Sequence, residues 1–363
     1  MSGLLKLARP ELTALPPYIA GAWEPGLTRL NANESPWQAP GDHTERGLNV
    51  YPPPRPEAIA ERLAGFYGTH KQNVLVTRGT SEAIDVLIRG FCEAGSDRIL
   101  ICPPTFDMYR LYAGIQGADV CRIPLLRHDD PQQDFRLDVA RIIEAAADRV
   151  KLIFLCSPNN PTGGSAAPEQ VEEICESVSG RALVVIDEAY QEFAGSSGFS
   201  SLQSRYEHVV ILRTLSKCVS LAGVRCGALL GDPELIGFLE KVLPPYTFPT
   251  PSIELVMDVL DEESMAVSRE RTQLIRDERG RISAELADSP LVIRVWPSDA
   301  NFVFVKTTSG MRFSEAAREA GILVRLFPND PTLEDCVRIT VGRPEDNDRL
   351  LGAIAKEGIS NGD

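Results

Sequence analysis

The sequence lacks the marks of several protein classes. It has only four histidines, far apart, and its eight cysteines form no CxxC pair, so we expect neither a zinc site nor a disulfide framework. It contains no GxxxxGK[ST] loop and no GxGxxG, the fingerprints of nucleotide sites. No apolar run reaches the roughly 18 residues of a membrane span, and the opening MSGLLKLARPEL has no long apolar segment typical of a signal peptide. We therefore expect a cytoplasmic protein that binds no metal.

Basic residues are also in short supply. The chain has 37 Lys and Arg against 51 Asp and Glu, a formal net charge of −14 over 363 residues. This excess of negative charge argues against electrostatic binding to nucleic acid or to an anionic membrane surface. An anionic small-molecule substrate would need a local basic pocket. The length is enough for two domains.

Short apolar runs recur along the first three quarters of the chain. They occupy residues 73–77, 98–102, 151–156, 182–187, 208–214 and 226–231. Runs that are apolar throughout are typical of strands buried on both faces. Amphipathic segments such as 80–91 and 168–178 lie between several of them. The alternation predicts an α/β fold with a mainly parallel central sheet and helices on both faces.

The pattern changes at about residue 268. A charged, helix-favouring stretch over 268–286 leads to shorter strand-like segments. These segments are 291–296, 301–307, 322–327 and 336–342. We interpret the stretch as a connecting helix that leads into a smaller C-terminal α/β domain.

Polar residues follow the predicted strands, at the sheet edge where open α/β proteins bind ligands. Thr80 and Ser81 open a helix after the first run and could cap it or bind a phosphate. Asn160 lies in a turn after 151–156, and Asp187 ends an apolar run, where a carboxylate needs a cationic partner. The stretch RTLSKCVSLAGVR adds an amine, hydroxyls and a guanidinium: Thr214, Ser216, Lys217 and Arg225.

Each feature alone is compatible with an ordinary cap, turn or surface lysine. Together they supply a lysine for a Schiff base, a carboxylate for a pyridinium nitrogen and donors for a phosphate. Pyridoxal 5′-phosphate requires all three. The sequence therefore predicts a pyridoxal-phosphate enzyme.

Motifs along almost the whole chain carry a resemblance to a known family. They are LNANESP, YPPPRP, TRGTSEAI, PPTFDMY, SPNNPTG, DEAYQEF, LRTLSKCVSLAGVRCG, ANFVFV and VRITVG. The chain resembles the fold-type I pyridoxal-phosphate aminotransferases of classes I and II. NPTG, and SK followed eight residues later by Arg, mark the wider family, whereas NANESP, DEAYQEF and RITVG favour its histidinol-phosphate branch.

The resemblance implies a role for each site residue. Lys217, Asp187 and Tyr190 would be catalytic: Lys217 would hold the cofactor and move a proton, and Asp187 would pair with the ring nitrogen. The residues implied in cofactor binding are Lys217, Asp187, Asn160, Tyr190, Thr80, Ser81, Phe106, Thr214, Ser216, Arg225 and Tyr51. Within this set Phe106 would stack on the ring, and Tyr51 would reach the phosphate from a neighbouring subunit. Arg338, helped by Arg325 and Asn33, would bind the substrate.

The resemblance also implies an activity and an assembly. The activity is amino transfer from L-histidinol phosphate to 2-oxoglutarate in histidine biosynthesis, by a homodimer. A broad-range or aromatic aminotransferase and a threonine-phosphate decarboxylase of the same fold remain alternatives. The implied division is an N-terminal segment over 1–40 that contributes to the small domain and the dimer, a large cofactor-binding domain over 41–267 and a small domain over 268–363.

Overall fold

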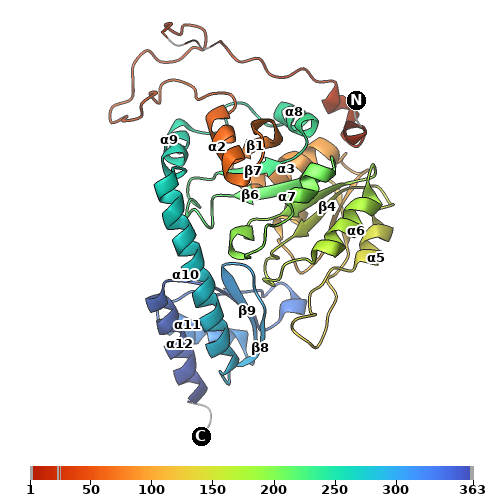
Figure 1. The fold of residues 1–363 in the computed structure, drawn as a ribbon, viewed down its shortest axis with the longest axis vertical. Helices are drawn as coiled ribbons and strands as arrows, with labels where there is room; N and C mark the ends of the chain where they lie inside the picture. The colour runs from red at the N-terminus through yellow and green to blue at the C-terminus, as the bar shows by residue number, and fades with distance from the viewer. Residues whose placement is uncertain (1–2, 23, 25, 360–363) are drawn as a thin grey trace.

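The chain folds around two β-sheets. The computed structural model describes residues 3–22, 24 and 26–359. The larger sheet has seven strands in the order β1-β7-β6-β5-β4-β2-β3, and the smaller has four in the order β10-β11-β9-β8. Figure 1 shows the smaller sheet at the end of the molecule opposite the N-terminal segment. The fold is thus the predicted α/β architecture with a second, smaller α/β unit.

The strands of the larger sheet are β1 (Val74–Thr77), β2 (Arg98–Ile101), β3 (Asp119–Arg122), β4 (Val150–Cys156), β5 (Leu183–Asp187), β6 (Val209–Thr214) and β7 (Gly227–Leu230). Neighbouring strands are parallel from β3 to β6, and β7 runs antiparallel to both β6 and β1. The prediction of a mainly parallel sheet is therefore confirmed. All six predicted strands are present, and β3 at the edge was missed.

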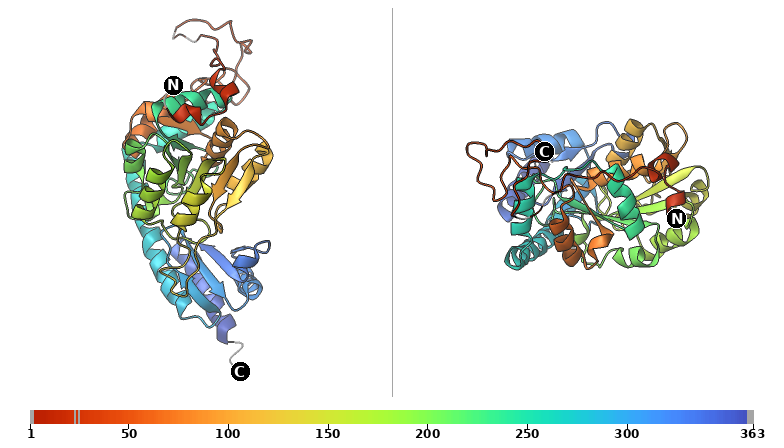
Figure 2. Two further views of the ribbon diagram at one scale, coloured as in Figure 1. Left: turned by 90° about the vertical axis from the view of Figure 1, so that its right-hand side faces the viewer. Right: turned by 90° about the horizontal axis from the view of Figure 1, so that it is seen from above.

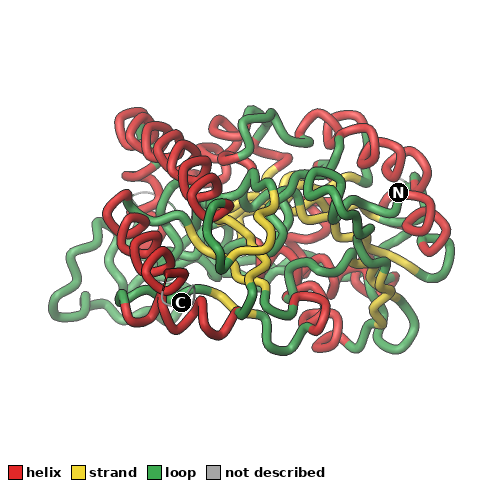
Figure 3. The backbone as a smooth tube through the Cα atoms, turned by 90° about the horizontal axis from the view of Figure 1, so that it is seen from below, coloured by secondary structure: helices red, strands yellow, loops and turns green. Residues whose placement is uncertain are grey.

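The helices of the large unit cover both faces of this sheet. They are α1 (Pro10–Thr13), α2 (Glu57–Tyr67), α3 (Thr80–Phe91), α4 (Met108–Gln116), α5 (Val139–Ala145), α6 (Pro168–Val178), α7 (Ser200–Arg205), α8 (Pro233–Val242) and α9 (Thr250–Val259). Short 3₁₀ helices are η1 (Leu4–Lys6), η2 (Lys71–Asn73) and η3 (Gln191–Phe193). Seen from below, helices lie outside the strands (Figure 3).

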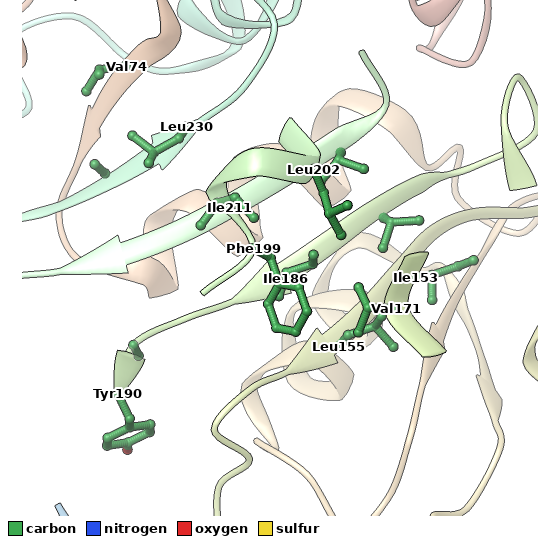
Figure 4. Close-up of a cluster of buried hydrophobic side chains, with 14 of the residues drawn as sticks. Val74, Ile153, Leu155, Val171, Ile186, Tyr190, Phe199, Leu202, Ile211 and Leu230 are labelled. Carbon is green, nitrogen blue, oxygen red and sulfur yellow. The ribbon is translucent and has the colours of Figure 1, made fainter. Parts of the chain in front are cut away.

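Alternate residues of the central strands point into two different cores. Val184 and Ile186 of β5 join a cluster with residues of α2, α5, α6 and α7 (Figure 4). Leu183 and Val185 of the same strand join a second cluster with residues of α3, α4 and α8. Because side chains alternate across a strand, an uninterrupted apolar run buries both faces. The apolar runs in the sequence follow from this double burial.

The smaller unit packs helices against an antiparallel sheet. Its elements are α10 (Glu262–Ala287), β8 (Val292–Trp296), β9 (Phe302–Thr307), α11 (Gly310–Glu319), β10 (Arg325–Leu326), η4 (Pro331–Leu333), β11 (Cys336–Thr340) and α12 (Pro344–Ile359). The predicted strand over 322–327 shortens to the two residues of β10. The 26-residue helix α10 runs along both units (Figure 1). Its buried Ile282 and Leu286 join the core of the smaller unit.

The segment before α2 extends away from the body. Figures 1 and 2 show it as a long irregular excursion at the end of the molecule far from the smaller sheet. We call its described residues 14–22, 24 and 26–50 the N-terminal arm. Large apolar side chains stand exposed along it, among them Ile19 at 88% exposed, Leu30 at 90% and Trp37 at 78%. Such a surface is typical of a segment that packs on another chain.

Among the described residues, no helix is long and apolar enough to span a bilayer. All eight cysteines are free, and six of them are buried.

Candidate active site

The topology brings the predicted strand-end residues to one edge of the large sheet. Strands β1, β4, β5 and β6 run in the same direction, so their carboxyl ends meet there. Strand β7 runs the other way, so its first residue, Gly227, lies at the same edge, in register with Thr77 and Thr214. The carboxyl ends of four strands and the start of a fifth therefore meet at one edge of the sheet, together with the polar residues there.

Asp187 is the last residue of β5 and lies inside the protein. Only 2% of it is exposed. Its Oδ2 accepts a hydrogen bond of 2.8 Å from the Tyr109 hydroxyl, and its Oδ1 accepts one of 3.2 Å from the backbone N–H of Ala189. Burial raises the pKa of Asp187 to about 6, although these two hydrogen bonds and the charge of Lys217 favour the ionised form.

Lys217 lies near the start of the loop that connects β6 to β7. Its Nζ is 5.6 Å from the ring centroid of Tyr190. Burial, followed by the positive charges of Arg338 and Arg225, lowers the pKa of Lys217, and Asp187 opposes them. Within the described part of the chain, Nζ makes no hydrogen bond or ion pair. An amine in this state loses its proton readily and can act as a nucleophile.

A second group of residues forms a cradle for an anion. Gly79, with φ at +75°, precedes the first residue of the 12-residue helix α3, which starts with Thr80 and Ser81. The guanidinium of Arg225 packs so closely on Gly79 that a Cβ there would lie 2.7 Å from Nη2. Gly227 is equally tight, since a Cβ would lie 2.9 Å from the backbone of Gly79. A helix N-terminus with a guanidinium at its first turn is suited to a phosphate.

The hydroxyls of the β6 end complete this cradle. Thr214 Oγ1 donates a 2.9 Å hydrogen bond to Ser216 Oγ, and the backbone N–H of Ser216 donates to Thr214 Oγ1 at 3.2 Å. Thr214 is in register with Gly227, which in turn pairs with Thr77 at the end of β1. The strand pairing therefore places both hydroxyls beside the α3 N-terminus.

Arg338 reaches the same place from the smaller sheet. It lies on β11, and its Nη1 donates a short hydrogen bond to Oδ1 of Asn160, in the loop after β4. Its guanidinium is 5.3 Å from the ring of Phe302, which packs edge-on against Tyr190. Burial lowers the pKa of Arg338, and so does the charge of Arg325, its partner across the β10–β11 pair. Two guanidinium groups side by side form a local positive patch in an acidic protein.

The remaining predicted residues differ in their placement. Phe106 is half-buried and meets Tyr109 edge-on, with ring centroids 5.6 Å apart. Tyr51 is 50% exposed and lies 5.1 Å from the ring of Tyr246, just after the N-terminal arm. Asn33 is exposed on that arm, with φ at +56°. A single chain thus gathers most of the predicted residues and leaves Tyr51 and Asn33 apart.

Sequence reasoning missed two features of the site. Tyr109 was not singled out, although it stands in the quoted motif PPTFDMY and contacts Asp187. Behind the site, the buried Arg213 forms ion pairs with Glu188 at 2.7 Å and with Glu192 at 3.3 Å. Charged residues inside buried stretches were a signal for the ion pairs, whereas the contact between Tyr109 and Asp187 had no signal in the sequence.

Pyridoxal 5′-phosphate fits the groups that the structure gathers. Lys217 offers a half-buried amine without a hydrogen-bond partner among the described residues. Across the same described part of the chain, no Lys, Arg or His side chain lies within ion-pair distance of the Asp187 carboxylate, so a cationic ring nitrogen would supply the missing charge. The cradle at Gly79 and Arg225 suits the phosphate.

Comparisons with known proteins agree with this reading. The family model "Aminotransferase class I and II" matches residues 29–354. The chain is 41% identical over 355 residues to a histidinol-phosphate aminotransferase from Xylella fastidiosa, covering 97% of this chain and 96% of that protein. It is 39% identical, with the same coverage, to one from Stenotrophomonas maltophilia.

A solved structure shows the same fold. The histidinol-phosphate aminotransferase from Clostridium acetobutylicum superposes with a TM-score of 0.76 at 24% identity, over 86% of this chain and 92% of that one. The sequence match, the shared fold and the converging lysine, carboxylate and phosphate cradle agree. The chain belongs to the class I and II aminotransferases, whose cofactor is pyridoxal 5′-phosphate.

Proposed function

We propose that this enzyme transfers the amino group of L-histidinol phosphate to 2-oxoglutarate, giving imidazole-acetol phosphate and L-glutamate. The observation that carries the substrate is the 41% identity, over 97% of the chain, to an enzyme of that name. The site adds a chemical reason: the amino donor histidinol phosphate and the acceptor 2-oxoglutarate both present an anion, and the Arg338–Arg325 pair offers a place for it. A guanidinium can bind a phosphate or a carboxylate with two donors.

Bound pyridoxal phosphate supplies the electron sink that makes the substrate Cα acidic. We assign Lys217 two tasks. Its Nζ would hold the cofactor before substrate arrives, and afterwards it would accept the proton from the substrate Cα and give it back. The lowered pKa of Lys217 serves both tasks, because both require the free amine.

Asp187 and its neighbours would hold the ring. The Asp187 carboxylate would keep the ring nitrogen protonated, while Asn160 and Tyr190 would donate to the phenolic oxygen. Asn160 is prepared for this role, since its Oδ1 already accepts from Arg338 and its amide N–H₂ is left to donate. Phe106 would stack on the ring.

The hydroxyls and backbone donors of the cradle would hold the phosphate. These residues are Thr80, Ser81, Thr214, Ser216 and Arg225. Tyr51 would join them from a second subunit. At the other end of the pocket, Arg338 would hold the substrate's anion, and Arg325 and Asn33 would assist.

The assembly that we propose is a homodimer in which the N-terminal arm packs on the second copy. The arm exposes Leu15, Tyr18, Ile19, Leu27, Leu30, Trp37 and Leu48. Burying these side chains against a second chain would remove a large apolar surface from water. The same proposal includes the division into an N-terminal segment over 1–40 that contributes to the small domain and the dimer, a large domain over 41–267 and a small domain over 268–363. It also includes a cytoplasmic location, which the free thiols support.

The test is a side-by-side rate measurement with histidinol phosphate, phenylalanine and threonine phosphate, using 2-oxoglutarate as acceptor. We expect kcat/KM for histidinol phosphate to exceed the other values by at least about a hundredfold, because neither competitor carries both the phosphate and the imidazole ring of histidinol phosphate. Comparable turnover of phenylalanine would favour a broad-range or aromatic aminotransferase. Release of carbon dioxide from threonine phosphate would favour the decarboxylase.

A further inference from the structure

Tyr109 lies directly behind the carboxylate that faces the cofactor. It is the second residue of α4 and is completely buried. Its ring stacks on Phe154 of β4, with centroids 4.7 Å apart and planes 15° apart, and meets Phe106 edge-on at 5.6 Å. Its hydroxyl donates to Oδ2 of Asp187 at 2.8 Å. One side chain thus contacts both the predicted ring-stacking residue and the predicted ring-pairing acid.

Packing alone does not account for the hydroxyl. A phenylalanine at position 109 could make the same stack on Phe154 and the same edge contact with Phe106. A buried phenol, by contrast, must find a hydrogen-bond partner, because an unsatisfied polar group in the interior costs free energy. The hydroxyl finds this partner in Asp187, and the 2.8 Å distance is that of a good hydrogen bond.

The backbone N–H of Ala189 holds the other oxygen of Asp187, but at 3.2 Å. The Tyr109 bond is therefore the shorter of the two that fix the carboxylate plane. It comes from a different element, 78 residues away in sequence, so it ties the end of β5 to α4. Without the Tyr109 hydrogen bond, only the bond from the backbone N–H of Ala189 would restrain rotation of the Asp187 carboxylate.

We propose that Tyr109 is a positioning residue of the aminotransferase reaction, whose hydroxyl holds the Asp187 carboxylate ionised and in one orientation for the pyridine nitrogen. A hydrogen bond donated to a carboxylate favours its charged form. The inference deepens the proposed function and rests on the assignment of Asp187 as partner of the ring nitrogen.

Other titratable groups also face Asp187. Lys217 approaches from the turn after β6, Tyr190 from the segment after β5, and Cys156 from the end of β4, in register with Asp187. Burial raises the pKa of the Cys156 thiol to about 12 and that of Tyr190 above its usual range, so both stay neutral near pH 7. Among these groups, Asp187 is thus the acid whose charge changes between pH 5 and 7.

The experiment compares Tyr109→Phe with the wild-type chain, both stripped of cofactor and titrated with pyridoxal 5′-phosphate at several pH values. We expect the dissociation constant at pH 7 to rise roughly tenfold to a hundredfold, and the pH below which affinity is lost to move upward. The ¹³C signal of the Asp187 carboxyl in the cofactor-free protein should titrate at higher pH in the variant. Loss of packing alone would move neither titration.

Two further variants make the outcome decisive. Tyr112→Phe removes a hydroxyl from the same helix that has no hydrogen-bond partner in the described structure, and it should leave affinity and pH dependence unchanged. Asp187→Asn should weaken cofactor binding if Asp187 pairs with the ring nitrogen. If Asp187→Asn weakens binding while Tyr109→Phe changes neither affinity nor the carboxyl titration, the role of Tyr109 is refuted. If Asp187→Asn has no effect on binding, the assignment of Asp187 itself fails.

Discussion

Replacing Asp187 with asparagine should stabilise the cofactor-free protein while it nearly abolishes activity. The side chain is 2% exposed and lies at the end of a completely buried strand. An ionised carboxylate in such a place is costly without a cation, and among the described residues no cation lies within ion-pair distance of it. Asparagine has nearly the same shape and carries no charge to desolvate. Its one amide oxygen can accept from the backbone N–H of Ala189, and its N–H₂ can donate to the Tyr109 hydroxyl, which rotates to accept.

The pKa of Asp187 sets the size and the pH dependence of this effect. Burial raises it from 3.8 to about 6, and at about 1.36 kcal/mol per pKa unit the difference corresponds to roughly 3 kcal/mol. Below pH 3.8 the group is protonated in the folded and unfolded chains, so the cost vanishes. Between pH 3.8 and about 6 the folded chain keeps the proton and the unfolded chain loses it, and above pH 6 the full cost applies.

The assay is urea unfolding of both cofactor-free proteins across the pH range. We expect Asp187→Asn to be more stable than wild type by roughly 3 kcal/mol at pH 8, with the difference shrinking steadily toward pH 4. With pyridoxal phosphate bound, the order should reverse, because the cofactor stabilises the chain that binds it more tightly. An exposed control, Asp288→Asn at the end of α10, should show neither trend. A variant that is less stable than wild type at pH 8 without cofactor would refute the reasoning.

Three further outcomes follow from the site. Lys217→Ala should bind pyridoxal phosphate without a covalent link and lose turnover by several orders of magnitude; near wild-type rates would contradict its role, and borohydride should fix the cofactor only in the wild type. Arg338→Lys should raise KM for histidinol phosphate and glutamate together and leave the cofactor absorbance unchanged, because a point charge replaces a two-donor fork; unchanged KM values would count against the clamp. Mixing Lys217→Ala subunits with inactive Tyr51 variants should restore partial activity in heterodimers, as size exclusion and assay together can show; a monomer with full activity would exclude donation of Tyr51.

The sequence predicted most of the larger sheet because its strands are buried on both faces. Continuous apolar runs such as 182–187 leave few alternatives to a central strand. Strand β3 was missed because it lies at the edge and reads DVCR, with its first and last residues exposed. The sequence could not predict that β7 is antiparallel to its neighbours, because an apolar run does not indicate the direction of its strand.

The sequence also predicted those site residues that lie at the ends of buried strands or directly after them. Thr80, Asp187 and Lys217 could be selected because they follow apolar runs whose ends must meet at one edge. Tyr109 could not, because its contact with Asp187 spans 78 residues and depends on how α4 packs on β4. The contributions of Tyr51 and Asn33 stay predictions, since they depend on a second copy and on the arm.

The side chains of the motif DEAYQEF point in two directions. Asp187 and Tyr190 lie at the sheet edge where the predicted site residues gather, and Figure 4 shows Tyr190 beyond the end of the strand. Glu188 and Glu192 point the other way and pair with Arg213, the residue before Thr214 on β6. A buried ion pair adds little net stability, but breaking one leaves an uncompensated charge and is costly. These pairs therefore fix the end of β5 against the end of β6, and with it the position of Asp187 relative to the turn that carries Lys217.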